Sequence, residues 1–277
     1  MVVAAGVGTA IGLGITHFDS KSVAAGQQSP KALSTKSTPP LSRPRVSPES
    51  TTTEAASGRL QGKIVVIDPG HNGGNFNDPT FINSLIWNGR EMETCDTTGA
   101  ETDSGYTEAL FNFDVAEYLS ADLSEEGATV VLTRTNNDGV GPCVTQRAAI
   151  GNSNNANAAV SIHADGGPPT GSGFAVLEPV ADGPNNSVIT SSQVLGSDIR
   201  SAFLSQAVEP VSDYDGNDGI QPRNDLAGLN LTTVPKVLVE CANMRNAADA
   251  ALIVMPSWQQ SVARVLAQGI TQFLTTS

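Results

Sequence analysis

The chain has few of the residues that build most sulfur-ligated metal sites. Its three cysteines, Cys95, Cys143 and Cys241, are far apart, and none belongs to a CxxC pair. A thiolate zinc site is therefore not supported. The spacings HExxH and HxxE are also absent, which argues against the zinc peptidases that use them.

Basic residues are scarce as well. The chain has 15 Lys and Arg residues against 28 Asp and Glu residues, which gives a formal net charge of −13. Phosphate binding needs clustered Lys and Arg, so we expect no nucleic-acid partner. The same charge argues against strong binding to anionic membranes once the chain is processed.

No long hydrophobic run is present. The weakly hydrophobic stretch from Val2 to Ile15 is too short and too rich in glycine to span a membrane comfortably. It resembles the core of a secretory signal, with Ser22-Val23-Ala24 as a cleavage site, although no Lys or Arg precedes it. A buried core strand is the alternative, but nothing nearby would pair with it. We interpret residues 1–25 as an export segment and expect a secreted protein of the periplasm or cell wall.

Residues 26–62 consist mainly of Ser, Thr, Pro, Gln and Ala. Such a stretch buries too little apolar surface to offset its ordering entropy, so we predict a disordered, flexible linker. No internal repeat is visible. We expect one folded domain over residues 63–277.

Two of the three histidines follow apolar, β-branched runs. The run Ile64–Ile67 leads through Asp-Pro-Gly to His71, and the run from Ala158 leads to His163, whereas His17 lies in the export segment. Loops at the carboxyl ends of strands are where ligands and chemistry collect in open α/β sheets. We interpret the pair as a metal site; the alternative is two histidines that only bond to backbone at strand ends.

Elsewhere strand and helix patterns alternate. Apolar residues at helical spacing predict a helix over 106–126, and further helices are expected over 144–153, 188–208, 246–254 and 256–274. Strands are expected over 130–133, 158–165, 173–177 and 235–240. This alternation predicts an α/β fold, with a mostly parallel or mixed twisted sheet flanked by helices.

A long polar loop, residues 72–105, follows the first histidine. Its Asn88-Gly89 dipeptide suits the centre of a type I′ hairpin turn. Loops of this length are usually functional or mobile.

Four ionisable residues stand at the ends of predicted elements: His71, Glu108, His163 and Glu240. In a parallel sheet they can converge on one edge. Two histidines and a carboxylate form a zinc ligand set with one position left for water, and Glu240 could then move the water proton. Glu108 alone could simply complement a helix dipole. Glu240 is harder to dismiss, since an unpaired carboxylate after Val-Leu-Val is unfavourable without a partner.

Five segments carry a family resemblance: IDPGHNG, TEALFNFDVA, LTR at 132–134, SIHAD and VPKVLVE. Their order resembles that of zinc-dependent N-acetylmuramoyl-L-alanine amidases, in the form found in secreted, mycobacterial-type enzymes. The resemblance implies cleavage of the amide between N-acetylmuramic acid and L-alanine in peptidoglycan or muropeptides. It also implies that His71, Glu108 and His163 bind Zn²⁺ and that Glu240 is the catalytic acid/base.

Two positions depart from the family pattern. Asp165 replaces a frequent Asn after SIHA, and Cys241 replaces the usual Gly after the catalytic Glu. Neither is a proposed ligand, so the departures bear on substrate fit rather than on catalysis. The alternative function is a catalytically silent muropeptide-binding regulator on the same fold, which would be expected to lose a ligand or Glu240.

Export also bears on the cysteines and on assembly. Cys95 and Cys143 lie in predicted polar loops, while Cys241 follows an apolar strand. We therefore predict a Cys95–Cys143 disulfide and a free, buried Cys241. We expect a monomer.

Overall fold

Six strands form the central sheet, in the order β4-β1-β5-β8-β6-β7. The computed structural model describes residues 58–276, and all of them belong to one compact unit. Strands β4, β1, β5 and β8 are parallel, β6 runs antiparallel to β8, and β7 is parallel to β6. The sheet is therefore mixed, as predicted. The strand bounds are β1 Ile64–Pro69, β4 Thr129–Leu132, β5 Ala158–Asp165, β6 Ala175–Pro179, β7 Ile220–Arg223 and β8 Lys236–Asn243.

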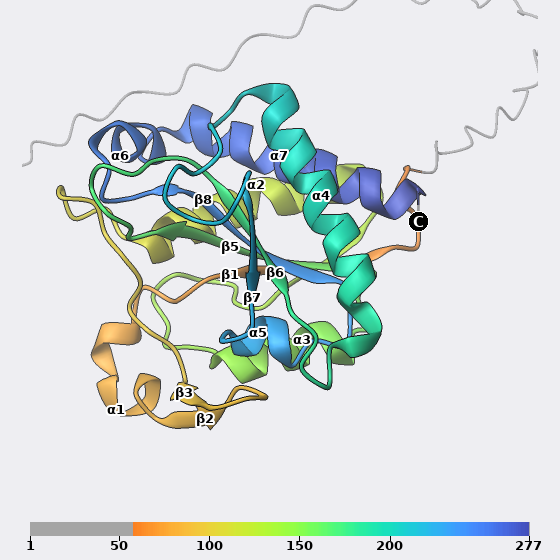
Figure 1. The fold of residues 1–277 in the computed structure, drawn as a ribbon, viewed down its shortest axis with the longest axis horizontal. Helices are drawn as coiled ribbons and strands as arrows, with labels where there is room; N and C mark the ends of the chain where they lie inside the picture. The colour runs from red at the N-terminus through yellow and green to blue at the C-terminus, as the bar shows by residue number, and fades with distance from the viewer. Residues whose placement is uncertain (1–57, 277) are drawn as a thin grey trace, which may run out of the picture. The chain divides into compact units, whose positions relative to one another are not determined.

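Helices cover both faces of the sheet (Figure 1). One face carries the long helices α2 Glu108–Glu125, α4 Ile189–Gln206 and α7 Pro256–Thr276, and the other carries α3 Val144–Ser153 and α5 Ala227–Asn230. The shorter helices are α1 Pro79–Ile82 and α6 Ala247–Ile253, with 3-10 turns at Asn75–Asn77 and Asn186–Val188. The predicted helices are confirmed to within a few residues.

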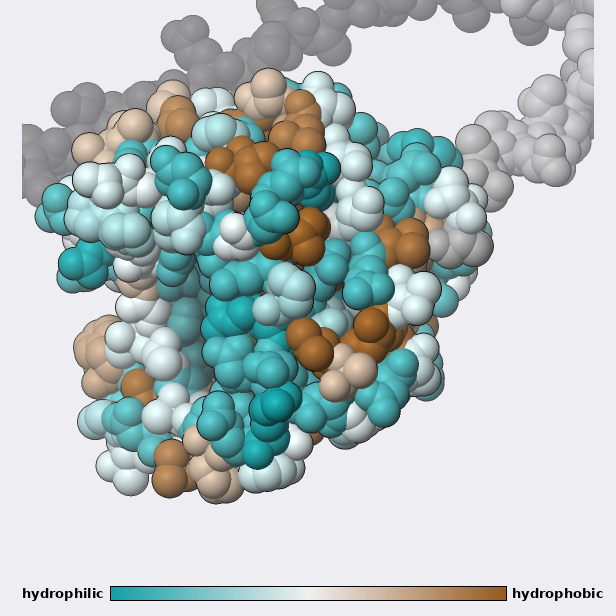
Figure 2. Space-filling model, in the orientation of Figure 1, coloured by the Kyte–Doolittle hydropathy of each residue, from teal (hydrophilic) through white to brown (hydrophobic). Residues whose placement is uncertain are grey.

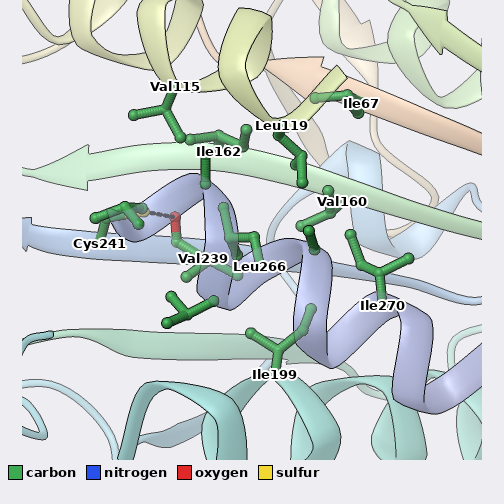
Figure 3. Close-up of a cluster of buried hydrophobic side chains, with 14 of the residues drawn as sticks. Ile67, Val115, Leu119, Val160, Ile162, Ile199, Val239, Cys241, Leu266 and Ile270 are labelled. Carbon is green, nitrogen blue, oxygen red and sulfur yellow. Dashed lines mark hydrogen bonds between the residues drawn. The ribbon is translucent and has the colours of Figure 1, made fainter. Parts of the chain in front are cut away.

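The main core lies between the sheet and the three long helices. Successive residues of β1 point to opposite faces, so Val65 and Ile67 join this core while Val66 packs toward Ile150 of α3. Figure 3 shows Ile162 of β5 facing α2 on one side and α7 on the other. Burying an aliphatic side chain of this size stabilises the fold by about 1.5–3 kcal/mol. This packing fixes the strands whose ends carry the site.

Several short elements were not predicted, among them α1 inside the expected loop 72–105, and two of them lie beside the site. Strand β7 contains Pro222, which is tolerated because β7 lies at the edge of the sheet. Helix α5 is a single turn of four residues, too short to show helical periodicity. Both form one wall of the cavity described below.

The predicted hairpin is present, but its turn differs from the expectation. Strands β2 Leu85–Trp87 and β3 Met92–Thr94 are antiparallel. The N–H of Asn88 donates to the carbonyl of Glu91 at 2.9 Å, so the central pair is Gly89-Arg90 rather than Asn88-Gly89. Gly89 has φ 102°, which puts glycine at the first central position, as in a type II′ turn. The hairpin was predicted correctly and its turn was not.

The folded part begins before the predicted boundary at residue 63. Leu60 is fully buried in the main core, and its N–H donates to the carbonyl of Glu126. Residues 58–62 are therefore part of the domain and not of the linker. A single apolar residue among Gly, Arg and Gln gives no periodic signal that could have shown this. The export segment and the rest of the linker lie outside the described residues. Within the described range, no helix is long and apolar enough to cross a membrane.

Candidate metal centre

The ends of three neighbouring parallel strands bring the predicted site residues together. Pro69 at the end of β1 is in register with Ile162 of β5, and His163 is in register with Glu240 of β8. The carboxyl ends of these strands therefore lie on one edge of the sheet. This is the edge at which α/β folds place their chemistry.

The turn after β1 is tightly packed against His163. A Cβ atom on Gly70 would lie 2.2 Å from the imidazole ring of His163, so only glycine fits there. The next residue, His71, has φ 57°, in the left-handed region that non-glycine residues rarely adopt. Such backbone strain persists only where surrounding contacts hold it, and it is common at functional sites.

Glu108 lies between the two histidines. Its Oε1 is 3.3 Å from Nε2 of His71 and 2.8 Å from Nδ1 of His163. It is buried in the first turn of α2, where Thr107 caps the helix by accepting from the N–H of Leu110. The three ligand atoms all lie within 4.8 Å of one another, which is close enough to hold one metal ion. The predicted ligand set thus comes together in space.

The charges of the cluster favour a cation at its centre. Burial opposes ionisation of Glu108, but His71 and His163 outweigh it and hold its pKa well below the usual range. Burial likewise opposes the charge on His71, yet Glu108 and Asp96 raise the pKa of His71 to about 10. A buried carboxylate facing two imidazoles therefore requires positive charge, which protons or a metal ion can supply.

Glu240 stands beside this cluster on β8. Its Oε2 is buried and has no hydrogen-bond partner among the described residues. Burial, together with Glu108 and Asp165, raises the pKa of Glu240 well above its usual value. A buried carboxylate oxygen without a partner is rare in folded proteins and calls for a functional explanation.

The cluster opens into a cavity of about 460 Å³. Its lining includes the four site residues and also apolar residues such as Leu226 and Leu229. Figure 2 shows a hollow on the left side of the visible face. Comparison with Figure 1 places this hollow above the β2–β3 hairpin and below α6. Hydrophilic residues line this hollow, so a polar ligand can enter.

The cysteines of the structure are all free and all buried. Cys95 and Cys143 nonetheless lie side by side, and the N–H of Val144 donates to the carbonyl of Cys95 at 2.8 Å. Burial and the neighbouring Cys143 thiol raise the pKa of Cys95 to about 12. Cys241 is separate, with its thiol 3.8 Å from the carbonyl oxygen of Val239. The predicted disulfide therefore stays a prediction, although the two thiols meet.

The sequence did not single out Asp96 and Arg147, which contact His71 from behind. Asp96 lies inside the predicted loop 72–105 and Arg147 inside the helix predicted over 144–153, and neither belongs to a motif. Arg147 is buried on α3, and a buried arginine in a polar stretch gives no signal before the fold is known.

Two imidazoles and a carboxylate around one point, with an unpartnered carboxylate beside them, are a set that could hold a metal ion and that resembles the centres of metal-dependent hydrolases. They stand at the carboxyl edge of a mixed α/β sheet, where a cavity gives access to them.

Comparisons with known proteins place the chain more narrowly. A family model described as N-acetylmuramoyl-L-alanine amidase matches residues 65–272. The amidase Rv3717 of Mycobacterium tuberculosis is 39% identical over 223 residues, which cover 80% of this chain and 90% of that protein. The chain belongs to the N-acetylmuramoyl-L-alanine amidase family and is a hydrolase, as the motifs predicted.

Solved structures agree with this assignment. The amidase Ami1 of Mycobacterium smegmatis is 40% identical, with a TM-score of 0.75 over 79% of this chain and 99% of that one. Ami1 of Mycobacterium abscessus is 39% identical, with a TM-score of 0.73 over 78% of this chain and 100% of that one. The expected mycobacterial type is therefore confirmed as a similarity of sequence and fold.

Proposed function

We propose that this protein is a zinc-dependent amidase that separates the peptide stem of peptidoglycan from its glycan. The bond cleaved joins the lactyl group of N-acetylmuramic acid to L-alanine. In this proposal His71, Glu108 and His163 hold the zinc, and Glu240 is the catalytic acid/base. The observation that carries it is the unpartnered Oε2 of Glu240 beside three converging ligand atoms.

The donor set fits zinc. Two imidazole nitrogens and one carboxylate oxygen are a common protein ligand set of catalytic zinc, which keeps its fourth position open. Nδ1 of His163 and Nε2 of His71 both face Oε1 of Glu108, so a lone pair from each residue can point to one centre. When bound, zinc supplies Lewis acidity that makes water a nucleophile near neutral pH.

Glu240 would then move the proton. Its unpartnered oxygen can accept a proton from the attacking water and deliver it to the nitrogen of L-alanine as the C–N bond breaks. No described side chain or backbone group competes for this oxygen. The position of Glu240 beside His163, on the neighbouring strand, keeps it within the same site.

The substrate is proposed to occupy the cavity of about 460 Å³ next to the ligands. Its apolar wall, formed by α5, can receive aliphatic groups such as the methyl group of L-alanine. Peptidoglycan lies outside the cell membrane, so this function supports the predicted export and a location in the periplasm or cell wall. We propose a monomer as the active unit.

An oxidised Cys95–Cys143 pair is proposed as part of the same picture. An exported protein meets oxidising conditions in which paired thiols form disulfides. The two thiols already lie in contact, so little rearrangement is needed.

The test is product analysis on the full chain. Purified muropeptide is incubated with zinc-loaded protein, and the products are separated and weighed by mass spectrometry. We expect free peptide with an N-terminal L-alanine together with an intact saccharide. Muropeptide binding by zinc-loaded protein without any release would contradict the proposal and favour a silent muropeptide-binding regulator.

A further inference from the structure

The two histidines of the site are held very differently at their second ring nitrogen. Nε2 of His71 faces Glu108, so Nδ1 points away from the ligand cluster. There it lies 3.2 Å from Oδ1 of Asp96 and 3.2 Å from the carbonyl oxygen of Thr97. For His163 the roles are reversed, because Nδ1 faces Glu108, and its Nε2 has no hydrogen bond among the described residues. Only His71 is braced from behind.

The Nδ1 contacts select one tautomer of His71. The carboxylate of Asp96 and the carbonyl of Thr97 can only accept hydrogen bonds, and the Thr97 hydroxyl, 3.2 Å from the same nitrogen, can also accept one, so these contacts favour the ring hydrogen on Nδ1. That leaves the lone pair on Nε2, the atom that faces the other ligands. A metal-binding histidine commonly donates its other N–H to a carboxylate, which fixes the orientation of the ring and raises its basicity as a ligand.

Asp96 is itself fixed on both oxygens. The N–H of Thr97 donates to Oδ1 at 2.8 Å, and Nη2 of Arg147 donates to Oδ2 at 3.1 Å. Asp96 is only 4% exposed, so water cannot readily replace these partners. Its carboxylate therefore has a single orientation, with Oδ1 aimed at the ring of His71.

Arg147 uses every N–H group that it has. A guanidinium carries five N–H donors. Here Nε donates to the carbonyl of Pro142, Nη1 to Asp68 and to the carbonyl of Pro69, and Nη2 to Asp96 and to the carbonyl of His71. One side chain thus holds both the strained backbone of His71 and the carboxylate behind its ring. A lysine could not reproduce this planar set of donors.

We propose that Asp96, held by Arg147, is a positioning residue that sets the tautomer and ring orientation of His71 for zinc binding. The proposal rests on the zinc-amidase function proposed above. In this proposal Asp96 acts through His71 and takes no part in the bond-breaking step. Its contribution should therefore appear in zinc affinity before any catalysis is measured.

The test measures zinc affinity in the full-length protein by competition with a chromophoric chelator. In Asp96→Asn the amide NH₂ faces either the guanidinium of Arg147 or the N–H on Nδ1, and both are donors. Asp96→Ala removes the carboxylate altogether. Loss of such an outer partner typically weakens metal binding by about 10–100-fold, and we expect both variants to fall in that range.

Asp78→Asn is the matched control. Asp78 lies in the same long loop and caps α1 by accepting from the N–H of Phe81, a role that asparagine also performs. The substitution removes the same charge as Asp96→Asn, but Asp78 does not contact His71. The zinc affinity of the Asp78→Asn protein should therefore stay within about twofold of that of the unmodified protein.

A second readout follows the ring directly. Nitrogen NMR of histidine-labelled, zinc-free protein above about pH 10, where His71 is neutral, reports which ring nitrogen carries the hydrogen. We expect the Nδ1–H form in the unmodified protein and a mixture of both forms in Asp96→Ala. Wild-type zinc affinity together with an unchanged tautomer in folded Asp96 variants would overturn the proposal. So would a loss of thermal stability in the zinc-free variants with no loss of zinc affinity in the folded protein, since that result assigns Asp96 a purely structural role.

Failure of the proposed amidase function can be distinguished from failure of the positioning role of Asp96. If the unmodified protein binds no zinc, or binds it without releasing peptide from muropeptide, the amidase proposal fails, and without zinc binding the role of Asp96 fails with it. If the unmodified protein binds zinc and cleaves while the Asp96 variants bind zinc equally well, only the positioning role is wrong.

Discussion

Two carboxylates stand at the same edge of the sheet and are treated in opposite ways. Asp68, at the end of β1, accepts hydrogen bonds from Thr133 and Arg147 on Oδ1 and from Ser161 and Lys236 on Oδ2. Burial would raise its pKa, but Lys236 and Arg147 outweigh burial and hold the pKa of Asp68 well below its usual range. Asp68 is therefore a permanent anion that ties four elements together.

Glu240, within β8, is partly exposed, but its Oε2 is buried and has little compensation. No described group bonds its Oε2, and burial with Glu108 and Asp165 raises its pKa well above the usual value. A fully bonded carboxylate is locked in one protonation state, whereas an unbonded one can exchange a proton with a ligand. At this edge of the sheet, the number of hydrogen-bond partners separates the structural acid Asp68 from Glu240, the proposed acid/base.

The largest expected effect tests Glu240. Glu240→Gln keeps the shape of the side chain and removes the base. Turnover of muropeptide should fall by about two to four orders of magnitude, the usual contribution of a positioned acid–base group. Zinc content and melting temperature, measured on the same preparation, should stay near those of the unmodified protein because the three ligands are untouched. Near-normal turnover with zinc bound would end the catalytic role, and a parallel loss of zinc would show that Glu240 supports the ligands instead.

The next effect tests Asp68. Asp68→Asn leaves Lys236 buried without its anion and leaves Arg147 with Asp96 alone, and removing one partner of a buried ion pair costs about 3–5 kcal/mol. We expect a loss of that size in the free energy of unfolding, measured by urea titration of zinc-free protein. Glu240→Gln serves as the opposite case, since removing an unpaired buried carboxylate should not destabilise the zinc-free fold. Equal stability of the Asp68→Asn and Glu240→Gln proteins would contradict the distinction drawn between Asp68 and Glu240.

The third effect concerns the loop over residues 72–105, which carries Cys95 and Asp96. If Cys95 and Cys143 are bridged after export, the closed loop should stabilise the fold by roughly 4 kcal/mol in the chain-entropy model, and by less if the bridge is strained. Peptide mapping under non-reducing conditions should find this pair, and reduction should lower the melting temperature. The variant Cys241→Ala keeps the bridge and is the control for general thiol effects. A mapped bridge that includes Cys241 would refute the pairing.

The smallest expected effect concerns Glu178, a carboxylate away from the candidate metal centre. It tests whether burial without a partner is enough to raise the pKa of a carboxyl group. Glu178 on β6 is 7% exposed, and burial raises its pKa to about 7. Because the folded pKa lies above the unfolded value, the folded state binds the extra proton. Its contribution to stability is full below pH ~4.5 and is lost as the pH rises through about 7.

The measurement compares Glu178→Gln with the unmodified protein across pH. At about 1.4 kcal/mol per pKa unit, the stability of the variant relative to the unmodified protein should rise by on the order of 3 kcal/mol between pH 4 and pH 8. Glu117→Gln, which changes an exposed residue of α2, should show no such dependence. A flat difference for Glu178→Gln would show that water or a partner stabilises its ionised form.

Much of the fold follows from local patterns that the sequence carries by itself. Apolar β-branched runs gave β1 and β5, and helical spacing of apolar residues gave α2 and α7, because these patterns depend only on neighbours within a few residues. Strand ends followed by histidine also indicated the metal site, since parallel strands deliver their carboxyl ends to one edge. The motif series added Glu108 and Glu240, which local pattern alone left open.

Only the tertiary structure decided which groups surround these residues. The bond from Lys236 to Asp68 joins residues 168 positions apart, and the bond from Arg147 to Asp96 joins residues 51 positions apart. The burial of Leu60 and the antiparallel direction of β6 are likewise set by packing. Periodicity and propensity report the preferences of short segments, whereas the partners of a buried charge depend on how distant segments meet. The sequence therefore determined the residues that are proposed to carry out the chemistry, and the fold determined that Asp68 is fully bonded while Oε2 of Glu240 has no partner among the described residues.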